Sequence, residues 1–401
     1  MGAGKVLLRV MFWVLTVAFL VVGNHLALLD NNMDLQADQF NVETAQVAHI
    51  VNIEEFSHQV TPDFAIESTI ITFNARLSSG EREGEYVLAE HNLDGLLIVR
   101  ERPVEVGDRV LLTYEYAIGR YAFVDYVRIN YIAILGGVLL GLMVLFGGLR
   151  GFGSVVALGF TCAAVFLVLV PSILGGRNIY LVAVLVCVYI IVSTLIIVVG
   201  PNKKAACAII GCLGGVAVAA GLMFFMDVLL NLTGVIDNDS QFILALPVDY
   251  QLDLRAIVFA GVIVGAVGAI MDVAMSIASS LWEVSRAGEE LSFGRIFSSG
   301  LNIGKDILGT MLNTLILAYI GSSLSLILMI AFHSHATSFI ELFNREPIAV
   351  EVLRALIGSF GIFLAIPITA ATCGWLYSRK EGRIRPEKPP RNRREGYSSD
   401  W

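Results

Sequence analysis

Eight apolar blocks constrain the fold of this 401-residue chain more than any other feature. A helix needs about 17–25 mainly apolar residues to cross the hydrocarbon core of a bilayer. Backbone amides in lipid must be paired within their own segment, so we expect transmembrane helices and not open strands. The blocks run from Val6 to Val22, Tyr131 to Gly148, Ser154 to Leu174, Ile179 to Val199, Ala205 to Leu230, Ala256 to Leu281, Ile307 to Phe332 and Ala355 to Tyr377.

The composition agrees with a polytopic membrane protein. Hydrophobic residues make up 56% of the chain and charged residues 15%, whereas soluble domains carry about 25% charged residues. The first block, with Lys5 directly before it and Arg9 near its start, has the charge pattern of a signal peptide. The following "VVGNHLALLD" lacks the usual small-x-small cleavage site, so we favour an uncleaved anchor over residues 1–23.

The basic residues predict the orientation, because cytoplasmic segments of membrane proteins are rich in lysine and arginine. With the N-terminus inside, all six lysines face the cytoplasm, and eight crossings return the basic tail, residues 378–401, to the same side. We expect this tail to be disordered. The cytoplasmic basic residues are Lys5, Arg9, Arg150, Lys203, Lys204, Arg286, Arg295, Lys305 and those of the tail.

Residues 24–130 form the one sizeable polar region, which this orientation places outside the membrane. Short alternating stretches are separated by turn signals such as "SSGEREGE" and "VEVGDR". We expect a small β-rich domain, either an OB-like barrel or a sandwich. The region carries 18 acidic residues, seven arginines and no lysine, which argues against nucleic acid as a partner. The predicted strands are "AQVAHIVNI", "STIITFNARL", "EYVLAEHN", "DGLLIV", "DRVLLTYEY" and "RYAFVDYV".

The predicted fold class is therefore an all-α polytopic membrane bundle of about eight transmembrane helices with a small extracytoplasmic β-rich domain. The anchor and the β-rich domain are followed by a seven-helix transmembrane domain over residues 131–377.

One stretch, "GAIMDVAMSIASSLWEV" at residues 268–284, places an aspartate inside an apolar span. On a helix, Asp272, Ser276, Ser279 and Glu283 fall on one face, because they are spaced by four, three and four residues. Upstream, "GVIVG" is a small-xxx-small pattern that lets another helix approach closely. We therefore expect this helix to be central in the bundle.

The following span repeats the pattern. Asn302, Asp306, Thr310 and Asn313 are spaced by four, four and three residues and share a second polar face. If the two faces meet, they enclose a site or a water-filled vestibule. The polar connector "WEVSRAGEELSFGRIFSSGLNIGK" between the spans is predicted to form an amphipathic surface segment or a gate.

Asp272 is the residue that most strongly indicates a function, because placing a carboxylate near mid-bilayer costs at least about 2.5–3.5 kcal/mol of insertion free energy. The cost is relieved if Asp272 is protonated, pairs with Asn313 or binds a cation. A carboxyl that changes between these states can couple ion movement to a conformational change. The alternative is a fixed hydrogen bond that only holds two helices together.

The residues favour neither a metal site nor an enzyme. All five cysteines lie in predicted spans, so we expect packing roles and neither a disulfide framework nor a zinc site. Asp272 and Asp306 have the broad arrangement of an intramembrane aspartyl protease, but their contexts, "MD" and "IGKD", differ from the motifs of those enzymes. No phosphate-binding G-x-x-x-x-G-K-[ST] loop occurs. We expect no cofactor.

Four segments resemble the YibE/F-like family of bacterial multipass membrane proteins, over about residues 40–377. The resemblance implies a bacterial inner-membrane protein, described for the family as uncharacterised or as a permease, and leaves the substrate open. The segments are "GLRGFGSVVALGFT", "VPSILGG", "GAIMDVAMSIASSLWEV" and "SGLNIGKDILGTMLNTLILAYIGSSLSLIL". The resemblance implies that the motif positions are Asp272, Ser276, Ser279, Glu283, Asn302, Gly304, Asp306, Asn313, Thr314, Tyr319 and Gly321.

Two functions follow as expectations. The first is a permease or exporter of a small solute or ion, with Asp272 and the region of Asn313 as the coupling site. The second is a non-transporting scaffold or signalling component that recognises a partner through its outer domain. The expected partners are the lipid bilayer, a small solute or ion, and another copy of the chain or a different membrane protein, and nucleic acid is not expected.

Overall fold

The chain forms two compact units in a computed structural model, which describes residues 3–28, 42–61, 64–93, 102–115, 119–244, 252–287, 292–333 and 338–378. One unit covers residues 32–147, and the other combines residues 1–31 with residues 148–401. The predicted tail after residue 378 lies outside the described residues, and so does the predicted strand "DGLLIV".

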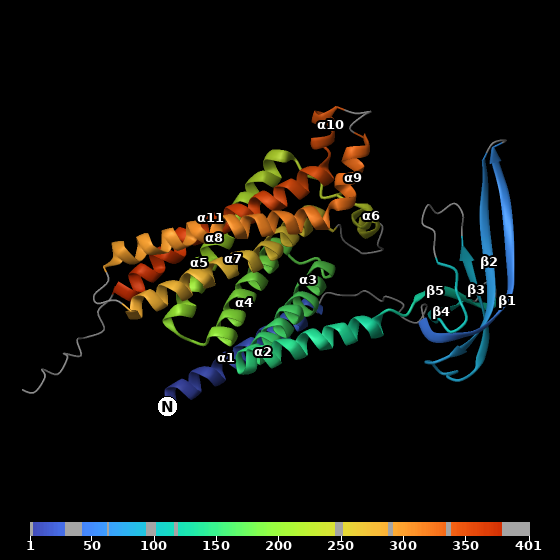
Figure 1. The fold of residues 1–401 in the computed structure, drawn as a ribbon, viewed down its shortest axis with the longest axis horizontal. Helices are drawn as coiled ribbons and strands as arrows, with labels where there is room; N and C mark the ends of the chain where they lie inside the picture. The colour runs from blue at the N-terminus through green and yellow to red at the C-terminus, as the bar shows by residue number, and fades with distance from the viewer. Residues whose placement is uncertain are drawn as a thin grey trace, which may run out of the picture. The chain divides into compact units, whose positions relative to one another are not determined.

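The first unit contains a closed five-stranded barrel with the strand order β1-β2-β3-β5-β4 (Figure 1). All neighbouring strands are antiparallel except β3 and β5, which are parallel. Of the two predicted alternatives, a barrel and a sandwich, the structure confirms the barrel. Five strands is the number found in OB folds. The strands are β1 (Val42–Thr61), β2 (Phe64–Leu77), β3 (Tyr86–Leu93), β4 (Arg109–Glu115) and β5 (Arg120–Tyr126).

The barrel closes because alternate residues along each strand are apolar and point inward. Phe73 and Ala75 of β2, Ala89 of β3, and Val110 and Leu112 of β4 are completely buried. These side chains form one continuous core. Five of the six strands predicted from the alternation are therefore present in the part of the chain that the structure describes.

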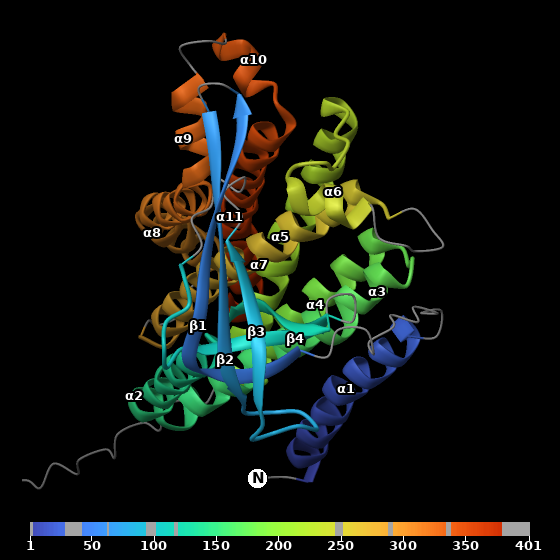
Figure 2. The ribbon, with the colours of Figure 1, turned by 90° about the vertical axis from the view of Figure 1, so that its right-hand side faces the viewer.

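The hairpin of β1 and β2 extends beyond the strands that close the barrel. Its pairing runs from Ala45 opposite Leu77 to Thr61 opposite Phe64, whereas β3 pairs with β2 only as far as Thr69. Figure 2 shows the resulting two-stranded arm. Isolated two-stranded ribbons are marginally stable. The arm therefore depends on the barrel for its order.

The second unit is a helical bundle, and helix α2 (Ile129–Ala164) begins in the first unit and ends in the second. Among the described residues, seven helical runs are long and apolar enough to cross a membrane. This composition is that of a membrane protein. The helices are α1 (Ala3–Leu28), α2 (Ile129–Ala164), the π-helical turn η2 (Val165–Leu169), α3 (Val170–Leu174), α4 (Ile179–Val199), α5 (Lys203–Leu230), α6 (Asn238–Leu244), α7 (Leu254–Ala287), α8 (Phe293–Ser322), α9 (Leu324–His333), α10 (Phe339–Phe343) and α11 (Glu346–Ser378).

Two predicted spans, residues 131–148 and 154–174, belong to one 46-residue run from Ile129 to Leu174. At about 1.5 Å per residue the run is about 69 Å long, which is more than twice the bilayer core. Gly148 interrupts its helical geometry with φ 55° and ψ −134°. This positive φ is a conformation that favours glycine. The break lies where the prediction separates the two spans.

The prediction of one helix from Ile307 to Phe332 is wrong, because two helices cover this range. Helix α8 begins at Phe293 and ends at Ser322, and a turn at Ser323 separates it from α9. The connector predicted as an amphipathic surface segment or a gate contributes the last residues of α7 and the first turns of α8, and its residues 288–291 lie outside the described residues. The prediction failed because polar residues on one face of an amphipathic helix lower its average hydropathy without ending it.

Helices α5, α7 and α11 pack closely through glycines (Figure 1). A methyl group added at Gly215 of α5 would lie 2.7 Å from the carbonyl oxygen of Gly361 in α11 and 2.9 Å from Cγ2 of Ile270 in α7. One turn along, Gly211 faces Thr369 at similarly close range. Small residues of this kind let membrane helices approach until their backbones touch.

Helix α1 packs against α3 and η2. The Phe19 ring stacks on Tyr189 of α4 with ring centroids 4.3 Å apart. The Arg177 guanidinium donates a hydrogen bond of 2.6 Å to the carbonyl oxygen of Leu26. These contacts make α1 part of the bundle.

We predict that Gly215→Ala destabilises the bundle by about 1–3 kcal/mol, because overpacked sites relax only by moving backbone. Gly221→Ala in the same helix is the matched control, since nothing lies within 4 Å of its added methyl group. Thermal unfolding of the detergent-purified full chain measures both. Equal unfolding temperatures for the two variants would contradict the close contact.

The barrel contains a tyrosine whose ionisation opposes folding. Burial raises the pKa of Tyr121 above its usual value, although Arg82 donates a hydrogen bond of 2.5 Å to its hydroxyl. The hydroxyl in turn donates to Glu43 at 3.1 Å. Because the folded state favours the neutral phenol, this contribution to stability is complete below about pH 10 and is lost as the pH rises through the folded-state pKa.

We therefore predict that the amides of the barrel strands lose hydrogen-exchange protection above pH 10 and that Tyr121→Phe weakens this pH dependence. The same variant lowers protection near neutral pH, because two hydrogen bonds are lost, each contributing about 0.5–1.5 kcal/mol. Tyr86→Phe, at an exposed strand position, is the control. An unchanged alkaline slope in Tyr121→Phe would exclude this tyrosine as the cause.

Candidate functional site

Helix α7 is the most buried of the candidate spans and contacts α4, α5, α8 and α11. Its core face includes Ile263, Ile270 and Ile277, which are completely buried. Its opposite face carries the predicted polar residues. Because all of them lie within one continuous helix, the shared face follows from the helical periodicity. The glycines Gly261, Gly265 and Gly268 and the acidic residues Asp272 and Glu283 on this face are exposed, and Ser276 and Ser279 are half-buried.

The carboxylate of Asp272 forms no hydrogen bond or ion pair with any residue that the structure describes. Nearby side chains satisfy their polar groups locally: the Ser280 hydroxyl donates to the Ser276 carbonyl oxygen at 3.0 Å. A fixed hydrogen bond that joins Asp272 to another described helix is therefore not present. The carboxylate remains available to water, a proton, a cation or another molecule.

The polar face of α8 also points away from the packed core. Asn302, Asp306, Thr310 and Asn313 are exposed. The Thr310 hydroxyl donates to the carbonyl oxygen of Ile307 at 2.9 Å, as hydroxyls in apolar helices commonly do. The packed face of the helix lies opposite, where Ile296, Gly300 and Gly304 are buried.

The two polar faces do not bond to each other within the described residues. Helices α7 and α8 contact each other, and a methyl group added at Gly300 would lie 3.0 Å from Cδ1 of Leu281. That contact uses the buried face of α8 and not its polar face. The expected pairing of Asp272 with Asn313 is therefore absent, and so is any hydrogen bond between Asp272 and Asp306.

Tyr319 of α8 lies close to α7 at a different position along the two helices. Its hydroxyl oxygen lies 3.6 Å from the position of a Cβ on Gly265 of α7 and 3.8 Å from that on Gly358 of α11. The motif resemblance includes this tyrosine, but its position opposite two glycines of other helices is not readable from periodicity. The space left by the glycines admits the phenol.

Two carboxylates near one end of the bundle were assigned no function from the sequence. Asp227 of α5 is 6% exposed, and its Oδ1 has no hydrogen-bond partner among the described residues. Glu346 accepts hydrogen bonds from the backbone amides of Thr233 and Gly234 and from the Thr233 hydroxyl, at 2.6–2.7 Å. Glu346 therefore holds the loop after α5 against the start of α11.

The described residues contain no group of three histidine, cysteine or carboxylate side chains that could hold a metal ion. Four of the five cysteines are buried and Cys162 is exposed, all as free thiols.

The long apolar helices have the length and composition of membrane-spanning helices. The family model for YibE/F-like proteins matches residues 135–379, which is more than half of the chain. The chain therefore belongs to the YibE/F-like family. The match begins at residue 135, so the barrel lies outside it, whereas the motif resemblance was expected to begin near residue 40. No curated protein and no solved structure matches the chain significantly.

We predict that Asp272→Asn leaves stability within about 0.5 kcal/mol of the wild type, because no described partner is lost. Glu346→Gln, in contrast, lowers stability by about 1–3 kcal/mol, because it weakens charge-assisted hydrogen bonds. Thermal unfolding of both variants in the same detergent checks the pair. A large loss in Asp272→Asn would show that the carboxylate has a structural partner.

Proposed function

We propose that this protein is a permease or exporter of a small solute in the bacterial inner membrane. In this proposal Asp272 is the coupling site, and the polar faces of α7 and α8 line the pathway. Both termini face the cytoplasm, and the barrel lies outside, in agreement with the distribution of lysine and arginine. We propose further that the protein needs no cofactor and is not an enzyme.

The observation that carries the proposal is the unpartnered carboxylate of Asp272 on the most buried span. An ionised carboxylate that faces hydrocarbon costs at least about 2.5–3.5 kcal/mol. Since no described side chain offsets this cost, a water-filled pathway, a proton or a bound cation is the remaining source of relief. Ionisable residues inside membrane spans commonly mark such pathways.

The neighbouring side chains support a pathway for small polar molecules. Glycines occupy one half of the exposed face of α7, and Ser276 and Ser279 occupy the other half. Small residues leave room beside the helix, and hydroxyls offer donors and acceptors to a passing solute. Asn302, Asp306, Thr310 and Asn313 extend the same chemistry along α8.

Alternating protonation of Asp272 supplies a coupling mechanism. The neutral acid is the form that a dry environment favours, and the carboxylate is the form that water or a cation favours. A conformational change that exposes this residue to one aqueous side and then to the other would move a proton or cation with each cycle. The solute then moves in the same or the opposite direction.

A second candidate function is a scaffold that recognises a partner through the barrel. The observation that favours it lies along β1, where Val51, Ile53 and, at the base of the arm, Phe56 are exposed although each is apolar. Exposed apolar residues on one strand are suited to contact another protein. In this case the bundle would anchor the barrel and would not transport.

We predict that full-length protein in proteoliposomes loaded with a bacterial small-metabolite extract releases a defined subset of solutes and that Asp272→Asn lowers this release at least about tenfold. Mass spectrometry of the external medium identifies the solutes, and a pH gradient of either sign tests proton coupling. Asp239→Asn, at an exposed position in the short helix α6, is the matched control.

Release that is equal in wild type and Asp272→Asn would exclude the coupling role of Asp272. If proteoliposomes release no more solute than protein-free liposomes loaded with the same extract, the scaffold is favoured. The reconstituted protein must then show the same unfolding temperature as before reconstitution.

A further inference from the structure

The barrel contains a cavity where its last strand leads into α2. Its volume is about 780 Å³. Side chains from the segment before β4, from β5 and from the start of α2 line it, and they are polar or aromatic with few exceptions. The lining residues that carry the argument are Arg102, Asp108, Arg109, Tyr126, Arg128 and Tyr131.

Positive charge is concentrated here in a region that is otherwise acidic. Residues 24–130 contain 18 acidic residues and only seven arginines, yet three of those arginines line this one cavity. Two aspartates, Asp108 and Asp125, accompany them. Among the described side chains, three arginines line the cavity with these two aspartates, and Glu105 pairs with Arg102. The guanidinium that has no described carboxylate partner is that of Arg109, which leaves one positive charge for an anion.

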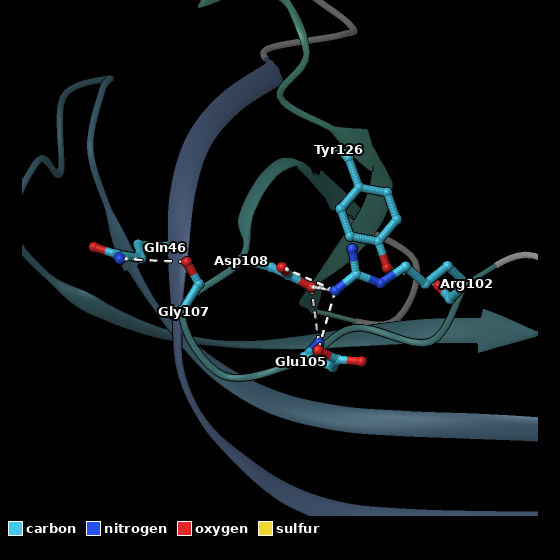
Figure 3. A network of polar contacts seen from close by, with 6 residues as sticks. All are labelled: Gln46, Arg102, Glu105, Gly107, Asp108 and Tyr126. Atoms are coloured by element: carbon cyan, nitrogen blue, oxygen red, sulfur yellow. Dashed lines mark hydrogen bonds and ion pairs between the residues drawn. The ribbon is translucent and has the colours of Figure 1, made fainter. Parts of the chain in front are cut away.

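Arg102 and Arg128 are held in place by neighbouring carboxylates. Arg102 pairs with Glu105 at 3.1 Å and Asp108 at 3.4 Å, and its guanidinium lies 5.7 Å from the centre of the Tyr126 ring (Figure 3). Arg128 pairs with Asp125 at 2.6 Å, and this contact lowers the pKa of the Asp125 carboxyl.

Arg109 differs from the other two arginines. Its side chain forms no hydrogen bond or ion pair with any described residue, although its backbone carbonyl oxygen accepts a hydrogen bond from the Val127 amide at 2.9 Å. The backbone of this residue is therefore fixed, while its guanidinium has no partner among the residues that the structure describes. A planar guanidinium is the side chain best suited to bind two oxygens of a phosphate.

The start of α2 adds to the positive potential. The first backbone amide that bonds within the helix is that of Ile132, which donates to the carbonyl oxygen of Arg128. The amides of the first turn have no partner within the helix, and a helix N-terminus attracts anions. Tyr131 of this turn is exposed and lines the cavity.

The position of the cavity along the chain identifies the source of the anion. The 46-residue apolar run begins at Ile129, directly after Arg128. In the proposed membrane topology the cavity therefore lies at the level of the lipid headgroups. Tyrosine and arginine side chains are typical of that level. Soluble phosphate esters carry the same chemical group, but they lack an acyl chain to extend along an exposed apolar helix.

We propose that this cavity binds the phosphate diester of an anionic membrane lipid, with Arg109 as the residue that contacts the phosphate. The inference rests on the membrane topology of the proposed function and is independent of transport. Bound lipid would fix the junction between the barrel and the membrane surface.

Native mass spectrometry of the full-length protein in detergent tests the proposal. The protein is titrated with phosphatidylglycerol, with phosphatidylcholine of the same acyl chains, and with glycerol 3-phosphate. We expect phosphatidylglycerol to bind most tightly. Arg109→Gln should weaken that binding about tenfold, since a charged hydrogen-bond partner of the phosphate is lost. Arg109→Lys should retain part of the affinity, because it keeps the charge.

Arg76→Gln is the matched control, because Arg76 is an exposed arginine of the same barrel outside the cavity. Equal binding by the wild type, Arg109→Gln and Arg76→Gln would overturn the site. No preference for phosphatidylglycerol over phosphatidylcholine would also overturn it. Displacement of the lipid by an equal concentration of glycerol 3-phosphate would overturn the lipid as the source. The unfolding temperatures of Arg109→Gln and Arg76→Gln should agree, which excludes misfolding as the cause of lost binding.

Discussion

Backbone contact between α5 and α11, with α7 against both, is the interaction on which the bundle depends. Lipid chains are as apolar as leucine, so burying leucine between membrane helices contributes little, and close packing must hold the helices together. Gly211, Gly215 and Gly361 provide that packing, because each faces atoms of another helix that would collide with an added methyl group. The contact uses one face of α7 and leaves the other face for polar residues. The architecture thus separates a face that maintains the fold from a face that is free for chemistry.

The elements were predictable where a local pattern determines them. Strict alternation predicted all five described strands, and hydropathy predicted the main apolar runs. The pattern failed at α8, where polar residues on one face led us to expect a start at Ile307, fourteen positions after the helix begins at Phe293. Periodicity also placed Asp272 on a polar face correctly. Periodicity could not predict that Asn313 forms no hydrogen bond with Asp272. The rotation of one helix against another depends on distant glycines such as Gly300 and Gly304.

Long-range contacts explain what else was missed. Glu346 is bonded to a loop more than a hundred residues away, and no spacing rule relates the two. Asp227 lies in the last turn of an apolar helix, where no sequence pattern marks it out, yet it is buried. The arginine-lined cavity joins the stretch from Arg102 to Arg109 with strand β5 and the start of α2. The antiparallel pairing of β4 with β5 brings these stretches together.

Gly148 has a consequence for the sidedness of the whole protein. A 46-residue apolar run cannot cross a bilayer once in a straight line, so in a membrane the chain must turn within it, and Gly148 is the residue whose dihedral angles depart from the helix. Each crossing inverts the compartment of everything downstream. The number of passages in this run, one or two, therefore determines on which side of the membrane every later loop and the C-terminus lie. In the proposed topology, which counts two passages, the sidedness of about 250 subsequent residues depends on the break at a residue that has no side chain.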